Sequence, residues 1–545
     1  MRDDNLENKG GHKFLAGTMI LAITGILVKF LGAFFRIPLT NLIGEVGMAY
    51  YGVAYPIYSL FLVLSTTGIP VAISKMVSER VVNNNYGGAH KVFKTALLLL
   101  SAIGFLSFVI CFFGAENIAK AVGNENAEYS IKAISPALLL IPLVSSFRGY
   151  FQGRQNMRPT AFSQLVEQIF RVSIGLLLSF LLIKNSLKLA AAGATFGATA
   201  GAFGALLTIG FIYYSDRKNL RKKIESFKTL YESYRHILKQ IVIIAVPITI
   251  GATIMPIMMN IDTALIMNRL QATGWSQEEA TALFGLLSGY CNSLIQFPQV
   301  FTMAVAISIV PAVSAAFAKK DQKDLDVNVK LGLRTMMIIG FPCSVGMFVL
   351  AKPILLLLYP MQVEGAIAAV PTFMILTIEI VFLSAVQTFT GILQGVSKMN
   401  VPVINLAISA LVKTVVTYIL VGIPAFNVMG AATGTVCAFM VACILDYLAV
   451  KKYIGTKFDF KFTVLKPFIS SIVMGIFAYG SYQGLYIVTE RNSISTLIAV
   501  AVGILVYFVM IFWTNSITRE ELMNIPKGDK IVKISDKMQL TKKAD

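Results

Sequence analysis

The first apolar stretch of the chain, FLAGTMILAITGILVKFLGAFFRIP at residues 14–38, decides the class of fold. Its only charged residues are Lys29 and Arg36. A helix needs about 20 mostly apolar residues to cross the hydrocarbon core of a bilayer, and this stretch is long enough. It is too long for the apolar part of a signal peptide and lacks a small-residue cleavage site. We therefore expect a first transmembrane helix, preceded by a cytoplasmic tail at residues 1–13.

The composition extends this pattern to the whole chain. Hydrophobic residues make up 56% of the 545 residues and charged residues 14%, whereas soluble domains carry about 25% charged residues. The mean hydropathy is +0.72, which indicates an all-α, polytopic membrane protein. No GxxxxGK[ST] phosphate loop occurs, so an ATP-driven pump is excluded. The five cysteines lack metal or redox spacing and the three histidines lie near lysines, so we expect no enzyme activity, no metal site and no cofactor.

Fourteen segments are apolar and long enough to cross a membrane. They are residues 14–38, 49–73, 92–113, 129–150, 159–183, 189–214, 239–265, 280–312, 329–350, 366–391, 401–422, 428–449, 465–488 and 493–514. The longest, 280–312, is expected to bend at Pro298, because proline removes a helix hydrogen bond.

The net charge of +19, from 47 Lys and Arg against 28 Asp and Glu, reflects topology. With the N-terminus inside, most cations fall in the segments that face the cytoplasm, as the positive-inside rule requires. Both termini, including a tail at residues 515–545, and a basic loop at 215–238 are therefore expected on the cytoplasmic side of the cytoplasmic membrane. Attraction to anionic inner-leaflet lipids accounts for the basic loop, so no nucleic-acid partner is expected.

An internal repeat appears when the second half of the chain is shifted by about 242 residues over the first. Gly149 then aligns with Gly391, for example. The repeat predicts two pseudo-symmetric six-helix lobes at residues 14–214 and 239–449, with two additional helices at 465–514. Parallel repeats of this kind are known in transporters whose substrate path lies between the halves. The alternative is a chance alignment of glycines and prolines, which are common in membrane helices.

Cations inside the predicted helices are the sharpest functional signal, since each is costly unless it faces protein or water. Lys29 and Arg36 lie seven residues apart on one helix face, and Lys29, Arg171 and Lys413 lie at similar predicted depths. In the repeat, Arg171 aligns with Lys413. Together these cations would suit a diphosphate or carboxylate group of a substrate. The alternatives are that Glu167, four residues before Arg171, merely neutralises it, and that Lys413 reaches the interface.

A second group of polar residues is a candidate for a coupling ion or a polar cavity. It consists of Asp262, Asn260, Asn292 and Gln296. One carboxylate makes a poor cation site, so a structural ion pair of Asp262 is the alternative, and a monovalent coupling ion is the kind of partner this group would suit.

Three motifs resemble a known family. The stretches RIPLTNLIG at residues 36–44, GIPVAISK at 68–75 and RGYFQG at 148–153 resemble the stage V sporulation protein B group. That group belongs with the lipid II flippases in the multidrug, oligosaccharidyl-lipid and polysaccharide exporter superfamily. Lys29 and Arg36 resemble the basic pair of those flippases, while Asn292 and Gln296 stand near a position where relatives carry a glutamate.

The resemblance implies a flippase that moves an undecaprenyl-diphosphate-linked cell-wall precursor, with lipid II as first candidate, to the outer leaflet by alternating access. The process served would be peptidoglycan synthesis or sporulation. It also implies a hydrophobic groove along residues 465–514 for the lipid tail, and cell-wall synthesis proteins as candidate partners. Three alternatives stay open: an exporter of teichoic acid or capsular polysaccharide precursors, a cation-coupled multidrug exporter, and a membrane scaffold that transports nothing.

Overall fold

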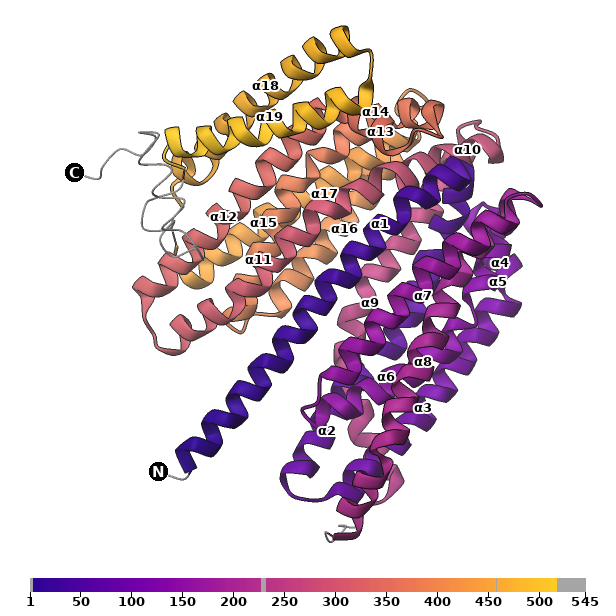
Figure 1. Ribbon diagram of the computed structural model, residues 1–545, viewed down its shortest axis with the longest axis vertical. Helices are drawn as coiled ribbons and strands as arrows, with labels where there is room; N and C mark the ends of the chain where they lie inside the picture. Colours follow the sequence, from indigo (N-terminus) through magenta and orange to yellow (C-terminus); the bar gives the residue numbers. More distant parts are fainter. Residues whose placement is uncertain (1–2, 227–231, 457, 517–545) are drawn as a thin grey trace. The chain divides into compact units, whose positions relative to one another are not determined.

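The computed structural model describes residues 3–226, 232–456 and 458–516. All regular elements in these ranges are helices (Figure 1). Thirteen helices there are long and apolar enough to cross a membrane, judged by length and composition. The predicted class, an all-α polytopic membrane protein, is therefore confirmed. Most of the predicted C-terminal tail and the middle of the basic loop lie outside the described residues.

The last twelve predicted segments each fall on a candidate span of their own. These spans are Tyr86–Phe113, Glu125–Gly153, Arg158–Leu182, Leu187–Ser226, Tyr234–Ala272, Gln277–Ala318, Gln322–Val349, Val363–Gly395, Asn400–Val421, Asn427–Ile454, Lys461–Thr489 and Asn492–Trp513. The first two predicted segments fall together in one candidate span, Met19–Val82. The total of fourteen stays a prediction.

Helix α1 (Asp3–Thr66) consists of two arms that join at Gly44, whose φ of 62° and ψ of −168° are not helical. The rings of Phe35 and Tyr51 lie 6.3 Å apart, one on each arm. In a straight helix, residues sixteen apart would be separated by about 24 Å. The arms therefore fold back on each other. Glycine is needed at the junction because this backbone region is essentially closed to other residues.

The chain divides into two compact units, residues 1–289 and 290–545. The repeat instead places the start of the second lobe at residue 239, and the two lobes remain a prediction. The helices of the first unit are α1, α2 (Gly68–Val82), α3 (Tyr86–Phe113), α4 (Ala115–Val122), η1 (Glu125–Ala127), α5 (Glu128–Ile134), α6 (Ala137–Gly153), α7 (Arg158–Leu182), α8 (Leu187–Ser226), α9 (Tyr234–Ala272) and α10 (Gln277–Gly285). One of its apolar clusters joins α2, α3, α6, α8 and α9.

A π-helical turn, η2 (Leu286–Cys291), carries the chain from the first unit into the second. Pro298 lies inside α11, six residues or more after this turn, and the bend there stays a prediction. The helices that follow are α11 (Asn292–Ala318), α12 (Gln322–Val349), α13 (Ala351–Leu358), α14 (Val363–Thr377), α15 (Glu379–Gly395), α16 (Asn400–Val421), α17 (Asn427–Ile454), η3 (Lys461–Leu465), α18 (Lys466–Thr489) and α19 (Asn492–Trp513). An apolar cluster of the second unit joins α11, α12, α15 and α17.

Glycines bring one helix onto the backbone of its neighbour in both units. A Cβ atom on Gly197 of α8 would lie 2.5 Å from the carbonyl oxygen of Arg171 on α7, and one on Gly434 of α17 would lie 3.3 Å from that of Lys413 on α16. The repeat aligns Arg171 with Lys413, so the two units use the same close packing at matching positions. Small residues permit this approach in membrane helices.

Helices α18 and α19 form a pair at the C-terminal end of the described chain (Figure 1). The buried Arg334 of α12 donates a 2.7 Å hydrogen bond from Nε to the carbonyl oxygen of Ser516, just after α19. Its guanidinium lies 3.7 Å from the ring centroid of Phe462, before α18. A cation at the C-terminal end of a helix is favourable, because the free carbonyl groups there are negative. Arg334 therefore fixes the pair against α12.

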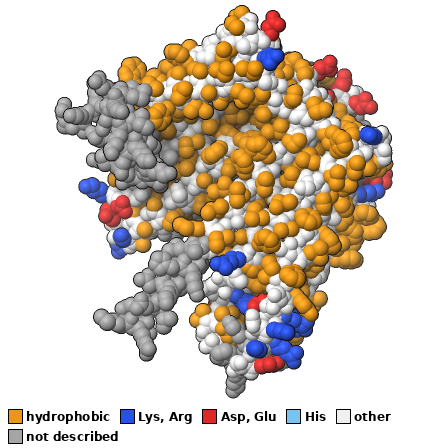
Figure 2. Space-filling model, viewed as in Figure 1, with side chains coloured by type: hydrophobic (Ala, Val, Ile, Leu, Met, Phe, Trp, Pro, Cys, Tyr) orange, Lys and Arg blue, Asp and Glu red, His pale blue; other side chains and the backbone are white. Residues whose placement is uncertain are grey.

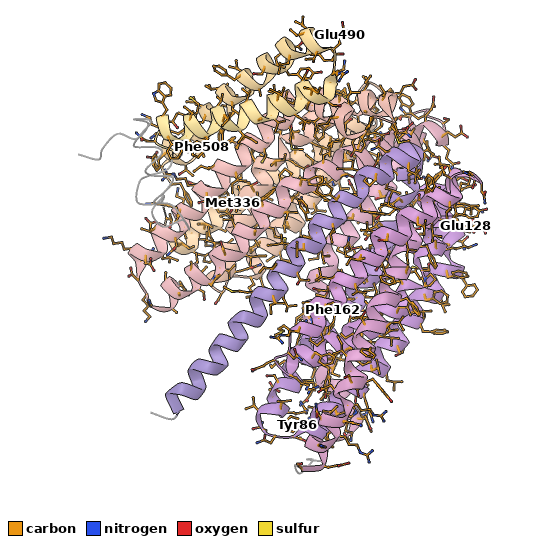
Figure 3. All side chains as sticks on the ribbon, viewed as in Figure 1. Tyr86, Glu128, Phe162, Met336, Glu490 and Phe508 are labelled. Atoms are coloured by element: carbon orange, nitrogen blue, oxygen red, sulfur yellow. The ribbon has the colours of Figure 1, made fainter. Side chains whose placement is uncertain are left out.

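Large apolar side chains cover most of the face in view, and charged side chains lie toward its edges (Figure 2). Phe162 on α7 is an example, with 57% of its surface exposed (Figure 3). Exposed apolar side chains in such number are expected where lipid is the solvent.

Candidate functional site

The candidate site lies in the first unit and starts at the hairpin of α1. The guanidinium of Arg36 lies 5.9 Å from the ring centroid of Tyr51 on the opposite arm. Tyr51 stacks on Tyr55 with 5.1 Å between the ring centroids, and Tyr55 meets Tyr58 edge to face at 5.7 Å. The fold of α1 at Gly44 therefore places Arg36 beside a row of tyrosines.

The row of tyrosines leads to Arg171 on α7. Arg171 donates a 2.9 Å hydrogen bond from Nη1 to the hydroxyl of Tyr55 and a 2.7 Å hydrogen bond from Nη2 to Oε1 of Glu167. The predicted pairing of Glu167 with Arg171, one helical turn apart, is thus confirmed. Two of the predicted cations, Arg36 and Arg171, are joined through the stacked Tyr51 and Tyr55 rings.

A third arginine completes the network. Arg148 on α6 donates from Nη2 to Oε2 of Glu167 at 3.0 Å and from Nε to the hydroxyl of Ser163 at 3.0 Å. The side chains of Arg148, Glu167 and Arg171 are only 14%, 15% and 17% exposed. One carboxylate thus forms ion pairs with two guanidinium groups. The three side chains together carry a net charge of plus one. A buried surplus of positive charge favours an anionic ligand.

One side of this network opens into a polar cavity of about 350 Å³ inside the first unit. Its walls come from the end of α1 and from α2, α6 and α7. Its polar lining residues are Thr66, Thr67, Ser145, Arg148, Gln152, Gln164 and Glu167. Hydroxyl and amide groups beside an arginine can bind sugar hydroxyls or phosphate oxygens by hydrogen bonds.

Two buried polar atoms beside the network have no hydrogen-bond partner among the described residues. They are Nε of Arg171 and the hydroxyl of Tyr58. Buried donors are normally satisfied, and exceptions mark places where a ligand or water completes the bonding. Among the described residues, Arg171 and Tyr58 therefore have hydrogen-bond donors beside Glu167 for which no acceptor is available.

The other predicted residues lie in several places. Lys29 is exposed on the first arm of α1. On α9, the Asn260 amide donates to the carbonyl oxygen of Pro56 at 2.8 Å, which gives Asn260 a structural contact, and Asp262 is half-buried two residues later. Their roles, including a coupling ion, stay predictions.

Three predicted residues belong to the second unit. Lys413 lies on α16, Asn292 begins α11 as an exposed residue, and Gln296 is half-buried one turn later. A shared site of these residues with Arg36 and Arg171 therefore remains a prediction.

Sequence reasoning missed Arg148 as a site residue, because Arg148 lies at the very end of the predicted helix 129–150 and has no acidic residue one turn away. The structure instead places it inside α6, bound to Glu167. The motif RGYFQG at residues 148–153 carried the signal, since it contains both Arg148 and the cavity residue Gln152. Tyr55 was likewise missed, because nothing in its spacing indicates a hydrogen bond to a residue 116 positions away.

An apolar cavity of about 440 Å³ lies in the second unit between α12, α13, α18 and α19. Tyr507 and Phe508 of α19 line it, with Met474 of α18 and Met347 of α12. Its walls expose almost only carbon and sulfur, so it suits hydrocarbon. It lies on the two helices for which the resemblance implies a lipid-tail groove.

Comparisons with known proteins agree with this architecture. The family model described as polysaccharide biosynthesis protein matches residues 14–317, and the MatE model matches residues 287–419. Three proteins of Bacillus subtilis (strain 168) are similar over most of their length. The uncharacterized membrane protein YabM is 30% identical over 97% of this chain and 98% of its own. The lipid II flippase MurJ is 28% identical over 91% and 94% of the two chains, and stage V sporulation protein B is 26% identical over 94% and 98%.

Solved structures show the same fold. A lipid II flippase MurJ in an inward closed conformation superposes with a TM-score of 0.66 at 18% identity, over 91% of this chain and 99% of that one. An inward-facing multidrug resistance transporter of the MATE family gives a TM-score of 0.65 at 15% identity, over 79% and 94% of the two chains. Together these matches show that the chain has the fold of these polytopic membrane proteins. The chain belongs to the polysaccharide biosynthesis protein family.

Proposed function

We propose that this protein is a flippase that moves an anionic, lipid-linked glycan precursor from the inner to the outer leaflet of the cytoplasmic membrane. The observation that carries the proposal is the buried cluster of Arg148, Glu167 and Arg171 with its surplus positive charge, which adjoins a polar cavity. A diphosphate could bind the arginines, while hydroxyl and amide groups of the cavity bind the sugar. The named relatives, a lipid II flippase and a sporulation protein, make lipid II the first candidate substrate.

The lipid tail needs a separate, apolar path, because an undecaprenyl chain does not enter a polar cavity. The apolar cavity beside α18 and α19 is a fitting place for part of that chain. Rocking of the two predicted lobes about the bound headgroup would then expose it on the outer side. With both termini on the cytoplasmic side, the interior-negative potential favours outward movement of the anionic headgroup.

The test is complementation of a bacterial strain depleted of its own lipid II flippases, with outer-leaflet lipid II as the measured quantity. The wild-type chain should restore it, and Arg148→Ala with Arg171→Ala should not. The matched control is Arg154→Ala, which also breaks a half-buried ion pair, to Asp216, outside the cavity. Failure of the wild-type chain to export lipid II, with export of a teichoic acid precursor instead, would reassign the substrate.

A further inference from the structure

Glu167 occupies the position that an anionic ligand would take between two arginines. Its Oε1 accepts a hydrogen bond from Arg171 and its Oε2 accepts one from Arg148, so each carboxylate oxygen binds a different guanidinium group. A phosphoryl group likewise offers two or more oxygens to arginine donors. Arg148 and Glu167 both line the polar cavity. A phosphate entering this cavity therefore meets a carboxylate that already binds the donors it needs.

The surroundings of Glu167 contain no further charge among the described side chains that face it. Arg148 on α6 and Arg171 on α7 form ion pairs with Glu167. From α1 come the tyrosine hydroxyls, with Tyr55 bound to Arg171. From α8 comes Gly201, where a Cβ would lie 2.5 Å from the carbonyl oxygen of Glu167.

Loss of the two arginines would leave Glu167 as an isolated carboxylate in the interior of a membrane protein. An unpaired buried charge is unfavourable, and a carboxylate in this position is neutralised by taking up a proton. We infer that Glu167 holds the ligand position in the empty protein, and that a diphosphate displaces it from Arg148 and Arg171 as Glu167 takes up one proton from water. The inference rests on the proposed function, because it assumes a diphosphate at these arginines.

The proton balance is simple. One proton leaves the aqueous phase and forms an O–H bond on the Glu167 carboxylate, while the diphosphate forms the hydrogen bonds that the carboxylate gives up. No other bond is made or broken. Because binding and protonation occur together, the affinity for diphosphate should rise by up to about tenfold for each unit of pH decrease while the free protein keeps Glu167 ionised.

The experiment uses the full-length protein in detergent, with inorganic pyrophosphate as the probe. Calorimetric titrations at pH 7 in two buffers of different ionisation enthalpy give the number of protons taken up on binding. The wild type should take up about one proton more than Glu167→Gln, and the protonation of pyrophosphate itself cancels in this difference. Glu167→Gln should also bind pyrophosphate more tightly at pH 7. The matched control is Glu128→Gln, which loses a pairing with Lys132 one turn away, outside the cavity, and it should behave as the wild type.

The outcomes separate the inference from the proposed function. Equal proton uptake by the wild type and Glu167→Gln, with pyrophosphate bound by both, overturns the inference and leaves the function standing. Absence of pyrophosphate binding in both overturns the two together. A measurement on the wild type alone covers the case in which the variant does not fold. The carbonyl stretch of a protonated carboxyl group should appear in the infrared difference spectrum when pyrophosphate is added, and its absence contradicts the inference.

Discussion

At the scale of single residues, the orientation of Arg171 depends on a hydroxyl group far away in sequence. Tyr55 accepts a hydrogen bond from Nη1 of Arg171, while Glu167 accepts one from Nη2. The guanidinium group is planar and rigid, so these two bonds fix its plane. The Nε donor has no partner among the described residues. Tyr55 therefore positions Arg171 without adding charge.

The substitution Tyr55→Phe tests this positioning role. It keeps the ring that stacks on Tyr51 and removes only the hydroxyl group. Hydrogen bonds to charged groups contribute about 1.5–3 kcal/mol, so the free energy of unfolding should fall by that amount. Thermal unfolding of the purified protein in detergent measures the change. Tyr214→Phe is the control, because Tyr214 is 71% exposed. Equal melting temperatures for the two variants would contradict the role.

At the scale of helices, the site depends on the sharp turn inside α1. The turn places Arg36 and Tyr51 on neighbouring arms, and it requires the backbone conformation of Gly44. A side chain at this φ and ψ costs about 1–3 kcal/mol. The arms also bring Tyr55 to Arg171, so the turn and the site are coupled.

Gly44→Ala should therefore destabilise the protein by about 1–3 kcal/mol and reduce export. Gly25→Ala is the matched control on the same helix, because a Cβ there would meet nothing within 4 Å. It should leave the stability equal or slightly higher, since alanine favours a helix more than glycine. Thermal unfolding and complementation measure the two effects. A Gly44→Ala protein as stable as Gly25→Ala would show that the turn does not need glycine.

The contact of α8 with α7 gives a second prediction at this scale. Gly197→Leu should push α8 away from the backbone of Arg171, because even a Cβ would lie 2.5 Å from its carbonyl oxygen. Overpacking of this kind costs about 1–3 kcal/mol or more, and the displaced Arg171 should lower export further. Gly210→Leu on α8 is the control, since a Cβ at Gly210 would meet nothing within 4 Å. Similar export by both variants would contradict the packing role.

At the scale of the whole molecule, the proposed transport moves negative charge outward. The potential across the membrane contributes about 2.3 kcal/mol for each charge and each 100 mV. In reconstituted vesicles, a fluorescent lipid diphosphate should therefore flip faster toward the positive side when a potassium gradient sets the potential. Reversal of the gradient should reverse the preference. A rate that does not depend on the potential would contradict the outward movement of net negative charge.

The sequence by itself determined the class of fold, since apolar segments of about 20 residues can only be satisfied as membrane helices. It also offered the pairing of Glu167 with Arg171 as one alternative, because four residues make one helical turn. These features are local, and their periodicity can be read without knowledge of the rest of the chain.

Only the tertiary structure decided which distant groups meet. It brought Arg148 of α6 to Glu167 and Tyr55 of α1 to Arg171, and it placed a polar cavity beside them. It also located a π-helical turn at Leu286–Cys291, just before α11. The physical reason is that contacts between helices depend on the rotation and crossing of each helix, which follow from packing among many side chains and from no local pattern.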